Sequence, residues 1–169
     1  MEVARTERLR LRWLDARDAP FVLELVNDPA WIRYIGDRNV RTLRDAERYI
    51  DDGPVAMYAR TGFGLYLVES RRTGEPVGLC GLIKRDSLED VDLGFALLPG
   101  HRGKGYALES AAAVMAYARA VVGLSRIVAI LSRDNERSRR LLEKLGFERE
   151  REIRLHADGE PLELYAAAA

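Results

Sequence analysis

The strongest constraint on the fold is a glycine-rich turn between an apolar segment and an alanine-rich one, in LLPGHRGKGYALESAAAVMAYA at residues 97–118. The apolar residues before the turn, 91–98, predict a strand, and those after it recur at helical spacing. A strand that passes through glycines into a helix exposes backbone N–H groups where the helix dipole favours negative charge. Gly100, Gly103 and Gly105 permit positive φ angles and close approach of a ligand. The pattern predicts a phosphate-binding turn; the alternative is a solvated turn that needs glycine only for its shape.

Basic residues stand among these glycines. Arg102 and Lys104, with His101 beside them, would add positive charge around an anion. Two common nucleotide-binding motifs do not account for the turn. The G-x-x-x-x-G-K-[ST] motif fails because Lys104 is followed by Gly105, and the chain contains no G-x-G-x-x-G.

Composition limits the classes of partner. Lys plus Arg and Asp plus Glu each number 27, so the formal net charge is zero and predicts no nucleic-acid or membrane partner. Cys80 is the one cysteine, which leaves no internal disulfide and fits a reducing compartment. No secretory leader or membrane-spanning run is recognised. We expect a single domain over residues 1–169, located in the cytoplasm, as a monomer or a homodimer.

Apolar periodicity predicts a mixed α/β fold without internal repeats. Strands are expected at 9–13, 63–70, 77–84, 91–98 and 126–132, the middle three as an antiparallel meander, with a closing hairpin of 147–155 and 162–166. Helix starts are expected at Asp15 with Asp18 and at Thr42 with Asp45, the second helix ending at DDGP, residues 51–54.

Two further helices are expected in the second half of the chain. The helix after the glycine turn has one apolar face, made of Leu108, Ala111, Ala112, Met115, Ala118 and Val122. The last predicted helix runs from Asn135 to Leu145 and ends at Gly146.

The glycine turn also carries a family resemblance. RGKGYA, residues 102–107, resembles the Arg/Gln-x-x-Gly-x-Gly/Ala signature of the Gcn5-related N-acetyltransferases (GNAT), between a strand and a long helix as in that superfamily. TERLRLRWLDARDA and DVDLGFALLPGHRGKGYALE resemble the opening and centre of its RimJ/RimL-like branch, which contains ribosomal-protein N-terminal acetyltransferases. NERSRRLLEKLGFE, residues 135–148, resembles the branch's Asn-x-x-Ser…Gly-Phe segment. Three matches in order cover nearly the whole chain.

The resemblance implies a mixed, mostly antiparallel central sheet with helices on both faces and a splayed strand pair that binds acetyl-CoA. It implies that the backbone of Ala96, Leu97 and Leu98 pairs with the pantetheine arm. The pyrophosphate would lie on the amides of Arg102, Gly103, Lys104, Gly105, Tyr106 and Ala107. Asn135 would contact the cofactor near the pantetheine and Ser138 near the sulfur; alternatively, Asn135 is only a helix N-cap and Ser138 an ordinary first-turn residue.

Acetyl transfer to an amine needs a polarised thioester carbonyl and a neutral amine. The backbone N–H of Leu97 or Leu98 is the expected oxyanion donor. Asp92 stands where the branch commonly has Glu, and strand alternation puts it on one face with Gly94 and Ala96, so it is our candidate base through a water. The alternative is a surface carboxylate.

The departing thiolate has no obvious acid. Many superfamily members have a Tyr four residues before the Gly-Phe pair, and this chain has Leu142 there. Ser138 is the nearest replacement, although a thiolate with a pKa of about 8.5 can also leave without an acid. His101 and His156 have no metal-ligand spacing, so no metal is expected.

The acceptor amine is expected to bind beside Trp31 and Tyr34, which in similar proteins line one wall of the acceptor groove, with the hairpin around residues 153–164 as the other wall. The alternative for these aromatic residues is core packing. Arg33 and Arg38 would repel a polyamine and tolerate a peptide, so a protein or peptide N-terminal α-amine is the expected acceptor. The alternatives are a small amine, such as a polyamine or an aminoglycoside-like compound, and a non-catalytic acyl-CoA-binding sensor.

Overall fold

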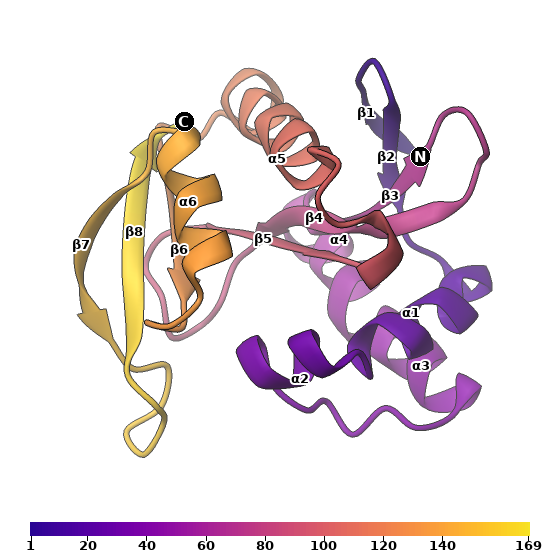
Figure 1. Ribbon diagram of the computed structural model, residues 1–169, viewed down its shortest axis with the longest axis horizontal. Helices are drawn as coiled ribbons and strands as arrows, with labels where there is room; N and C mark the ends of the chain where they lie inside the picture. Colours follow the sequence, from indigo (N-terminus) through magenta and orange to yellow (C-terminus); the bar gives the residue numbers. More distant parts are fainter.

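Strands with apolar inward-facing residues form one eight-stranded sheet in the computed structural model, which describes residues 1–169. The strand order is β1-β2-β3-β4-β5-β6-β8-β7 (Figure 1). The strands are β1 (Glu2–Arg5), β2 (Leu9–Trp13), β3 (Leu65–Ser70), β4 (Pro76–Ile83), β5 (Asp92–Leu97), β6 (Arg126–Leu131), β7 (Glu148–Ile153) and β8 (Leu162–Ala168). The predicted strands and the closing hairpin are confirmed to within a few residues at their ends. β1 was not expected, and β8 runs two residues further into the terminal alanines than predicted.

The central strands part from one another at one place. β3, β4 and β5 pair antiparallel, as the predicted meander requires. β5 and β6 are parallel, and their only paired residues are Asp92 and Val128 at the start of β5. Beyond that pair the two strands diverge, and the predicted splayed pair is confirmed.

Helices cover both faces of the sheet. They are α1 (Ala19–Val26), α2 (Pro29–Tyr34), α3 (Leu43–Ile50), α4 (Ala56–Thr61), α5 (Tyr106–Tyr117) and α6 (Glu136–Lys144). α1 and α3 pack on one face with Leu67 and Leu79 of the sheet, whereas α5 and α6 pack on the opposite face with Cys80 and Leu93. Figure 1 shows α5 and the α1–α3 group on opposite sides of β3–β5. This arrangement confirms the mixed α/β fold class.

Both predicted capping boxes form. Asp15 and Asp18 cap a short 3-10 turn, Ala16–Asp18, that leads into α1, and Thr42 and Asp45 cap α3. In each box the cap side chain accepts from a backbone N–H of the first helical turn. The acidic side chain three residues later accepts from the backbone N–H of the cap residue.

The DDGP segment does not end the helix that begins at Thr42. The chain continues as a π-helix, Asp51–Val55, and then as α4, which ends at Gly62 with a φ of 82°. Pro54 lies inside the π-helix, where the wider turn accommodates a residue without an N–H. The prediction was wrong because a π-bulge removes the clash that proline makes in an α-helix.

The apolar face of α5 also differs from the prediction. Ala112 is exposed, and the buried residues of the helix are Ser110, Ala111, Val114 and Met115. The Ser110 hydroxyl is satisfied within the helix by donating to the Ala107 carbonyl oxygen at 3.1 Å. A small polar residue therefore lies at the helix–sheet contact, which hydrophobic periodicity alone does not detect.

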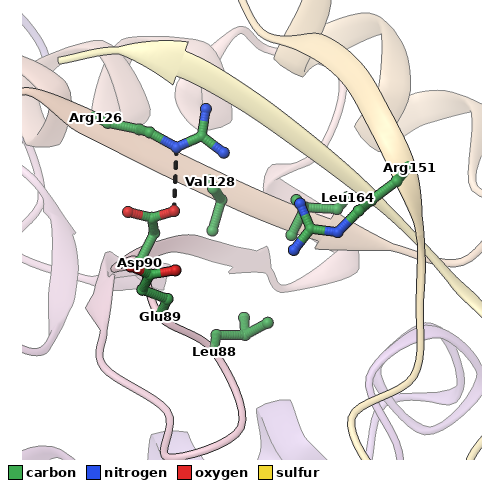
Figure 2. Close-up of a pocket in the computed structure, with 7 residues that line it drawn as sticks. All are labelled: Leu88, Glu89, Asp90, Arg126, Val128, Arg151 and Leu164. Carbon is green, nitrogen blue, oxygen red and sulfur yellow. Dashed lines mark hydrogen bonds and ion pairs between the residues drawn. The ribbon is translucent and has the colours of Figure 1, made fainter.

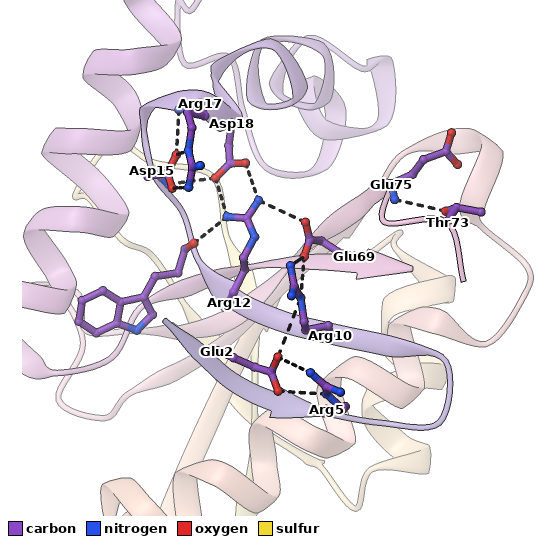
Figure 3. Close-up of polar contacts among 11 residues, drawn as sticks. Glu2, Arg5, Arg10, Arg12, Asp15, Arg17, Asp18, Glu69, Thr73 and Glu75 are labelled. Carbon is purple, nitrogen blue, oxygen red and sulfur yellow. Dashed lines mark hydrogen bonds and ion pairs between the residues drawn. The ribbon is translucent and has the colours of Figure 1, made fainter. Parts of the chain in front are cut away.

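An ion-pair network fixes α1 on the sheet (Figure 3). Arg12 of β2 bonds to Asp18 at 2.9 Å and to Glu69 of β3 at 3.2 Å, and Arg10 bonds to the same Glu69 at 2.5 Å. The Glu69 and Asp18 carboxylates are almost fully buried and have cationic partners. The network sets the position of the α1–α2 segment relative to β2 and β3.

The segment between β4 and β5 covers the outer face of β6 and β8, where Leu88 packs on Val128 and Leu164. Beside this contact a hollow of about 330 Å³ is bordered by Asp90 and Arg126, which form an ion pair at 3.0 Å (Figure 2). These contacts hold the chain just before Asp92, at the first residue of β5.

Candidate active site

A cleft of about 1090 Å³ runs through the gap between β5 and β6. One side is formed by α2, α3 and the π-helix, and the other by α6 and the β7–β8 hairpin. Of the residues expected in the site, the cleft is lined by Trp31, Tyr34, Asp92, Ala96, Leu97, Arg102, Ala107, Asn135 and Ser138. Leu98, Gly103, Lys104, Gly105 and Tyr106 lie outside this lining, in or next to the glycine turn.

The glycine turn presents unused backbone donors. Gly103 and Gly105 have φ angles of 76° and 83°, in the region that favours glycine. The amides of Gly103, Lys104 and Gly105 donate no hydrogen bond within the protein. The first hydrogen bond of α5 runs from the Glu109 N–H to the Gly105 carbonyl oxygen, so the amides of the preceding helical turn are also without intrahelical acceptors. Such a row of donors at a helix N-terminus fits a phosphate or pyrophosphate.

Arg8, which sequence reasoning missed, braces this turn from the β1–β2 hairpin. Its Nη1 donates to the Lys104 carbonyl oxygen at 2.8 Å, and its guanidinium lies over the Tyr106 ring at 4.6 Å. Its Nε donates to Glu109 at 2.7 Å. Thr6 also donates to Glu109, at 2.6 Å, so this glutamate joins the hairpin to α5 in addition to facing the helix dipole.

The side chain of Arg102 turns back toward the protein. Its Nε donates to the Leu97 carbonyl oxygen at 3.2 Å, and its Nη2 lies 2.6 Å from the Asp28 carboxylate. Asp28 is the N-cap of α2, where it accepts from the Ala30 amide at 3.2 Å. Arg102 therefore connects the glycine turn, β5 and α2.

Only one of the two expected oxyanion donors is available. The Leu98 N–H donates to the Val77 carbonyl oxygen at 3.0 Å, so it faces β4 and is occupied. Because backbone groups alternate along a strand, the Leu97 and Phe95 amides face the opposite side, where β6 has diverged. Leu97 is retained as a candidate donor, Leu98 is wrong in that role, and Phe95 is added.

Asn135 and Ser138 come to the cleft at the start of α6. Asn135 is the N-cap, and its side-chain oxygen accepts from the Ser138 amide at 3.2 Å. The Ser138 hydroxyl has no hydrogen-bond partner in the protein and Ser138 lines the cleft. The capping interpretation of Asn135 is confirmed, and it leaves the side-chain amide nitrogen free to bind a ligand.

Asp92 is not a surface carboxylate, because it is 1% exposed. Its Oδ2 accepts from the Arg85 Nε at 3.1 Å, and its Oδ1 is buried without any partner. Burial raises the pKa of Asp92 above its usual value, and the charge of Arg85 opposes that rise. A buried carboxylate oxygen without a donor is costly, and in a cleft it marks a place for a ligand proton.

The expected acceptor walls face each other across the cleft. Trp31 is 5% exposed and packs with α1 and α3, so its core packing is confirmed. It also lines the cleft, and its place in an acceptor wall stays a prediction. The β7–β8 hairpin contributes Leu155, His156, Gly159, Glu160 and Leu162 on the other side. Two further residues at this end, Tyr49 and Arg85, were not predicted. Arg85 follows β4 closely, so the hairpin register of β4 and β5 is the signal that pairs it with Asp92.

No group of three or more His, Cys, Asp or Glu side chains lies close enough together to hold a metal ion. None of the helices has the length and apolar character needed to cross a membrane. Cys80 is fully buried, and burial raises the pKa of its thiol to about 12.

A family model and a curated relative both match most of the chain. The family model described as Acetyltransferase (GNAT) domain matches residues 8–148. The uncharacterized N-acetyltransferase YoaA of Bacillus subtilis is 30% identical over 162 residues, which cover 94% of this chain and 91% of YoaA.

Solved structures show the same fold. An acetyltransferase from Agrobacterium tumefaciens superposes with a TM-score of 0.81 at 27% identity, covering 97% of this chain and 92% of that one. RimL, a ribosomal L7/L12 alpha-N-protein acetyltransferase solved in complex with coenzyme A, superposes with a TM-score of 0.84 at 19% identity. That likeness covers 99% of this chain and 98% of RimL.

Proposed function

This chain belongs to the GNAT family of acetyl-CoA-dependent N-acetyltransferases, and we propose that its acceptor is the α-amino group at the N-terminus of a protein or peptide. The proposal takes residues 1–169 as one acetyltransferase domain acting in the cytoplasm. The observation that carries it is the cleft, which begins near a turn of unused amides and passes Asp92, whose Oδ1 has no partner.

The residues of the glycine turn fit acetyl-CoA, which supplies the acetyl thioester. The amides of Gly103, Lys104 and Gly105 would donate to the pyrophosphate oxygens, with those of Tyr106 and Ala107 following in the first helical turn. The exposed β5 edge beside the gap offers peptide groups to the pantetheine, and Asn135 and Ser138 border the same gap from α6.

Asp92 would prepare the amine. An N-terminal amine has a pKa of about 8, so part of it is already neutral near neutral pH and no strongly basic group is needed. A carboxylate that accepts the remaining proton through one water is sufficient. The Leu97 or Phe95 amide would hold the carbonyl oxygen of the acetyl group, a type of contact that contributes about 2.7–4 kcal/mol in other acyl-transfer enzymes.

The thiolate would leave with little help. Leu142 occupies the position of the family's acid, and it is buried in the core with 1% exposure. The Ser138 hydroxyl can donate one hydrogen bond to the sulfur, and a thiol pKa of about 8.5 makes full protonation unnecessary.

An N-terminal peptide suits the acceptor end because the walls are formed by Trp31 and Tyr34 on one side and the hairpin on the other. The cleft extends between them, so an extended chain can continue away from Asp92. RimL, which has this fold, is described as an alpha-N-protein acetyltransferase, and this supports the same class of acceptor here. The guanidinium groups of Arg38 and Arg85 at this end disfavour a polycation.

Release of the coenzyme A thiol tests the proposal. The purified protein with acetyl-CoA is offered a panel of peptides with free N-termini, the same peptides with acetylated N-termini, spermidine and an aminoglycoside. We expect release only with free peptide N-termini. Turnover of spermidine or the aminoglycoside with no activity on any peptide would overturn the choice of acceptor and leave the acetyl-CoA chemistry in place.

A further inference from the structure

The acceptor end of the cleft gathers more hydrogen-bond donors than the acceptors beside them can use. Arg38 has no carboxylate partner, and the Tyr49 hydroxyl proton has no acceptor in the protein, although both residues line the cleft. Arg85 uses only its Nε, on Asp92, and its two Nη groups have no partner. These three side chains present hydrogen-bond donors to the cleft, and none of them is a carboxylate.

Their grouping has an electrostatic signature. Burial raises the pKa of Tyr49, and the charges of Arg38 and Arg85 are the main influences that oppose the rise. Arg38 reaches the cleft from the loop after α2, and its hydrogen bond to the Tyr49 oxygen also acts to lower the pKa of that residue. Arg85 reaches the same cleft from the end of β4.

The loop that carries Arg38 is held in place by its own contacts. The Asn39 amide donates to the Asp37 carboxylate at 2.8 Å, and Arg41 pairs with Asp37 at 2.5 Å. The Asn27 side chain donates to the Val40 carbonyl oxygen at 2.8 Å. Asn39 adopts a φ of 57°, which asparagine tolerates. Because Asp37 is paired with Arg41, it does not neutralise Arg38, which has no anionic partner.

The other arginine expected in the acceptor wall does not belong to this group. Arg33 pairs with Asp134 at 2.9 Å, and both side chains are about two-thirds exposed. The Arg33 charge is balanced and exposed to solvent, whereas Arg38 has no carboxylate partner.

We propose that Arg38, Tyr49 and Arg85 form a carboxylate-binding subsite, so that the preferred acceptor carries an acidic side chain close to the amine that is acetylated. A carboxylate accepts from several donors at once and matches the planar guanidinium groups. This inference rests on the proposed function, since it describes the side chain of a peptide acceptor.

The position of the acid in the peptide follows from Arg85. The same guanidinium bonds to Asp92 through Nε and would hold the acceptor carboxylate through its Nη groups. The amine at Asp92 and the carboxylate are therefore separated by only a few bonds, which places the acidic residue at the first or second position.

Binding in the absence of turnover tests the subsite. The full-length protein is saturated with coenzyme A, which carries no acetyl group, and titrated by calorimetry with two peptides that differ only in Glu or Gln at position two. Both peptides begin with Ser and end in an amide, so the Glu side chain is the only carboxylate. We expect about tenfold tighter binding of the Glu peptide, as expected for charge-assisted hydrogen bonds.

Three variants assign the effect. Arg38→Gln is expected to reduce the preference for the Glu peptide to about twofold. Binding of the Gln peptide should be unchanged, because that peptide has no carboxylate to pair with the Arg38 guanidinium. Tyr49→Phe is expected to reduce it partly. Arg44→Gln is the matched control, since Arg44 is exposed on α3 outside the cleft lining and its loss changes the net charge equally.

Equal affinity of the wild-type protein for all ligand pairs, or an unchanged preference in Arg38→Gln, would overturn the subsite. A second ligand pair, serine and serinamide, separates the two sources of carboxylate. Preference for serine with none between the peptides would support the subsite and overturn the peptide acceptor. Preference for the Glu peptide without acetylation of any peptide would likewise support the subsite and count against the proposed function alone.

Discussion

The Nη2 of Arg102 lies 2.6 Å from the Oδ2 of Asp28, 74 residues away in the sequence. Arg102 belongs to the glycine turn, and Asp28 begins the helix that carries Trp31. The Arg102 and Asp28 side chains are 26% and 8% exposed, so this pair is partly shielded from water and stronger than a surface pair. It couples the position of the proposed acceptor wall to the turn that is proposed to hold acetyl-CoA.

Asp28→Asn tests that coupling. Asparagine is as good an N-cap as aspartate, so α2 keeps its cap and loses only the charge opposite Arg102. We expect the KM for the acceptor to rise several-fold while the Kd for acetyl-CoA changes less than about twofold. Steady-state kinetics and calorimetry check this. Asp28→Ala, which also removes the cap, should add about 1 kcal/mol of destabilisation, and a purely structural role would show equal changes in both ligand constants.

Gly105→Asp is expected to weaken acetyl-CoA binding strongly. Gly105 has a φ of 83°, and only the Arg8 Nη2 lies near its Cβ position, at 3.1 Å. Aspartate and asparagine both tolerate this conformation, so Gly105→Asn is the neutral control. Because a carboxylate there would repel the pyrophosphate, Asp should weaken binding roughly tenfold to hundredfold beyond Asn. Calorimetry on folded variants decides; equal Kd values for Asp and Asn would place the phosphate elsewhere. Lys104→Ala should have a smaller effect.

Local sequence signals predicted much of the fold. The capping box of Thr42 and Asp45 and the alternation of residues 9–13 depend on neighbours a few positions away, and both form as expected. The glycine turn is equally local, because positive φ and a following helix are encoded within the segment 100–117. These features could be predicted since their energetics are complete within one turn or strand.

The missed contacts depend on tertiary structure. Arg8 meets Glu109 across 101 residues, and Arg102 meets Asp28 across 74, so no periodicity signals either pair. The failure at Pro54 has a different cause, because proline propensity assumes α-helical geometry and the chain adopts a π-helix there. Asp92 was predicted as a candidate, but its burial required knowing what the β4–β5 segment packs against.

Asp92→Asn is expected to lower kcat on the order of a hundredfold at neutral pH, with acetyl-CoA affinity unchanged. The loss should shrink as pH rises, because the free amine then supplies its own deprotonated form. Initial rates from pH 6 to about 10 check this, pH 10 lying above the amine pKa. A loss independent of pH would argue for a positioning role instead.

The pKa of Asp92 predicts the acidic limb of the wild-type profile. Burial favours the protonated form, so the ionised form is lost at a higher pH than for an exposed aspartate, and kcat/KM should fall at correspondingly higher pH. Arg85 favours the ionised form, so Arg85→Gln should move this limb to higher pH still. A limb that moves to lower pH in Arg85→Gln would contradict the assignment.

Trp31→Phe tests whether the buried indole N–H serves the acceptor. The Trp31 Nε1 is buried without a partner, and Trp31→Ala is unsuitable because emptying this core position would cost about 3–5 kcal/mol. Phenylalanine keeps most of the packing and removes only the donor. If Nε1 donates to the acceptor, its KM should rise about five- to tenfold, as for one lost hydrogen bond, with acetyl-CoA binding unchanged.

Trp13→Phe supplies the matched control for this experiment. The Trp13 Nε1 is also buried without a partner, but its ring stacks on Tyr58 at 4.5 Å and does not line the cleft. Both substitutions delete an unsatisfied buried donor, so urea denaturation should find neither variant less stable by more than about 1 kcal/mol. Only Trp31→Phe should raise the acceptor KM. Equal KM values in the two variants would assign Trp31 to the core alone and remove it from the acceptor wall.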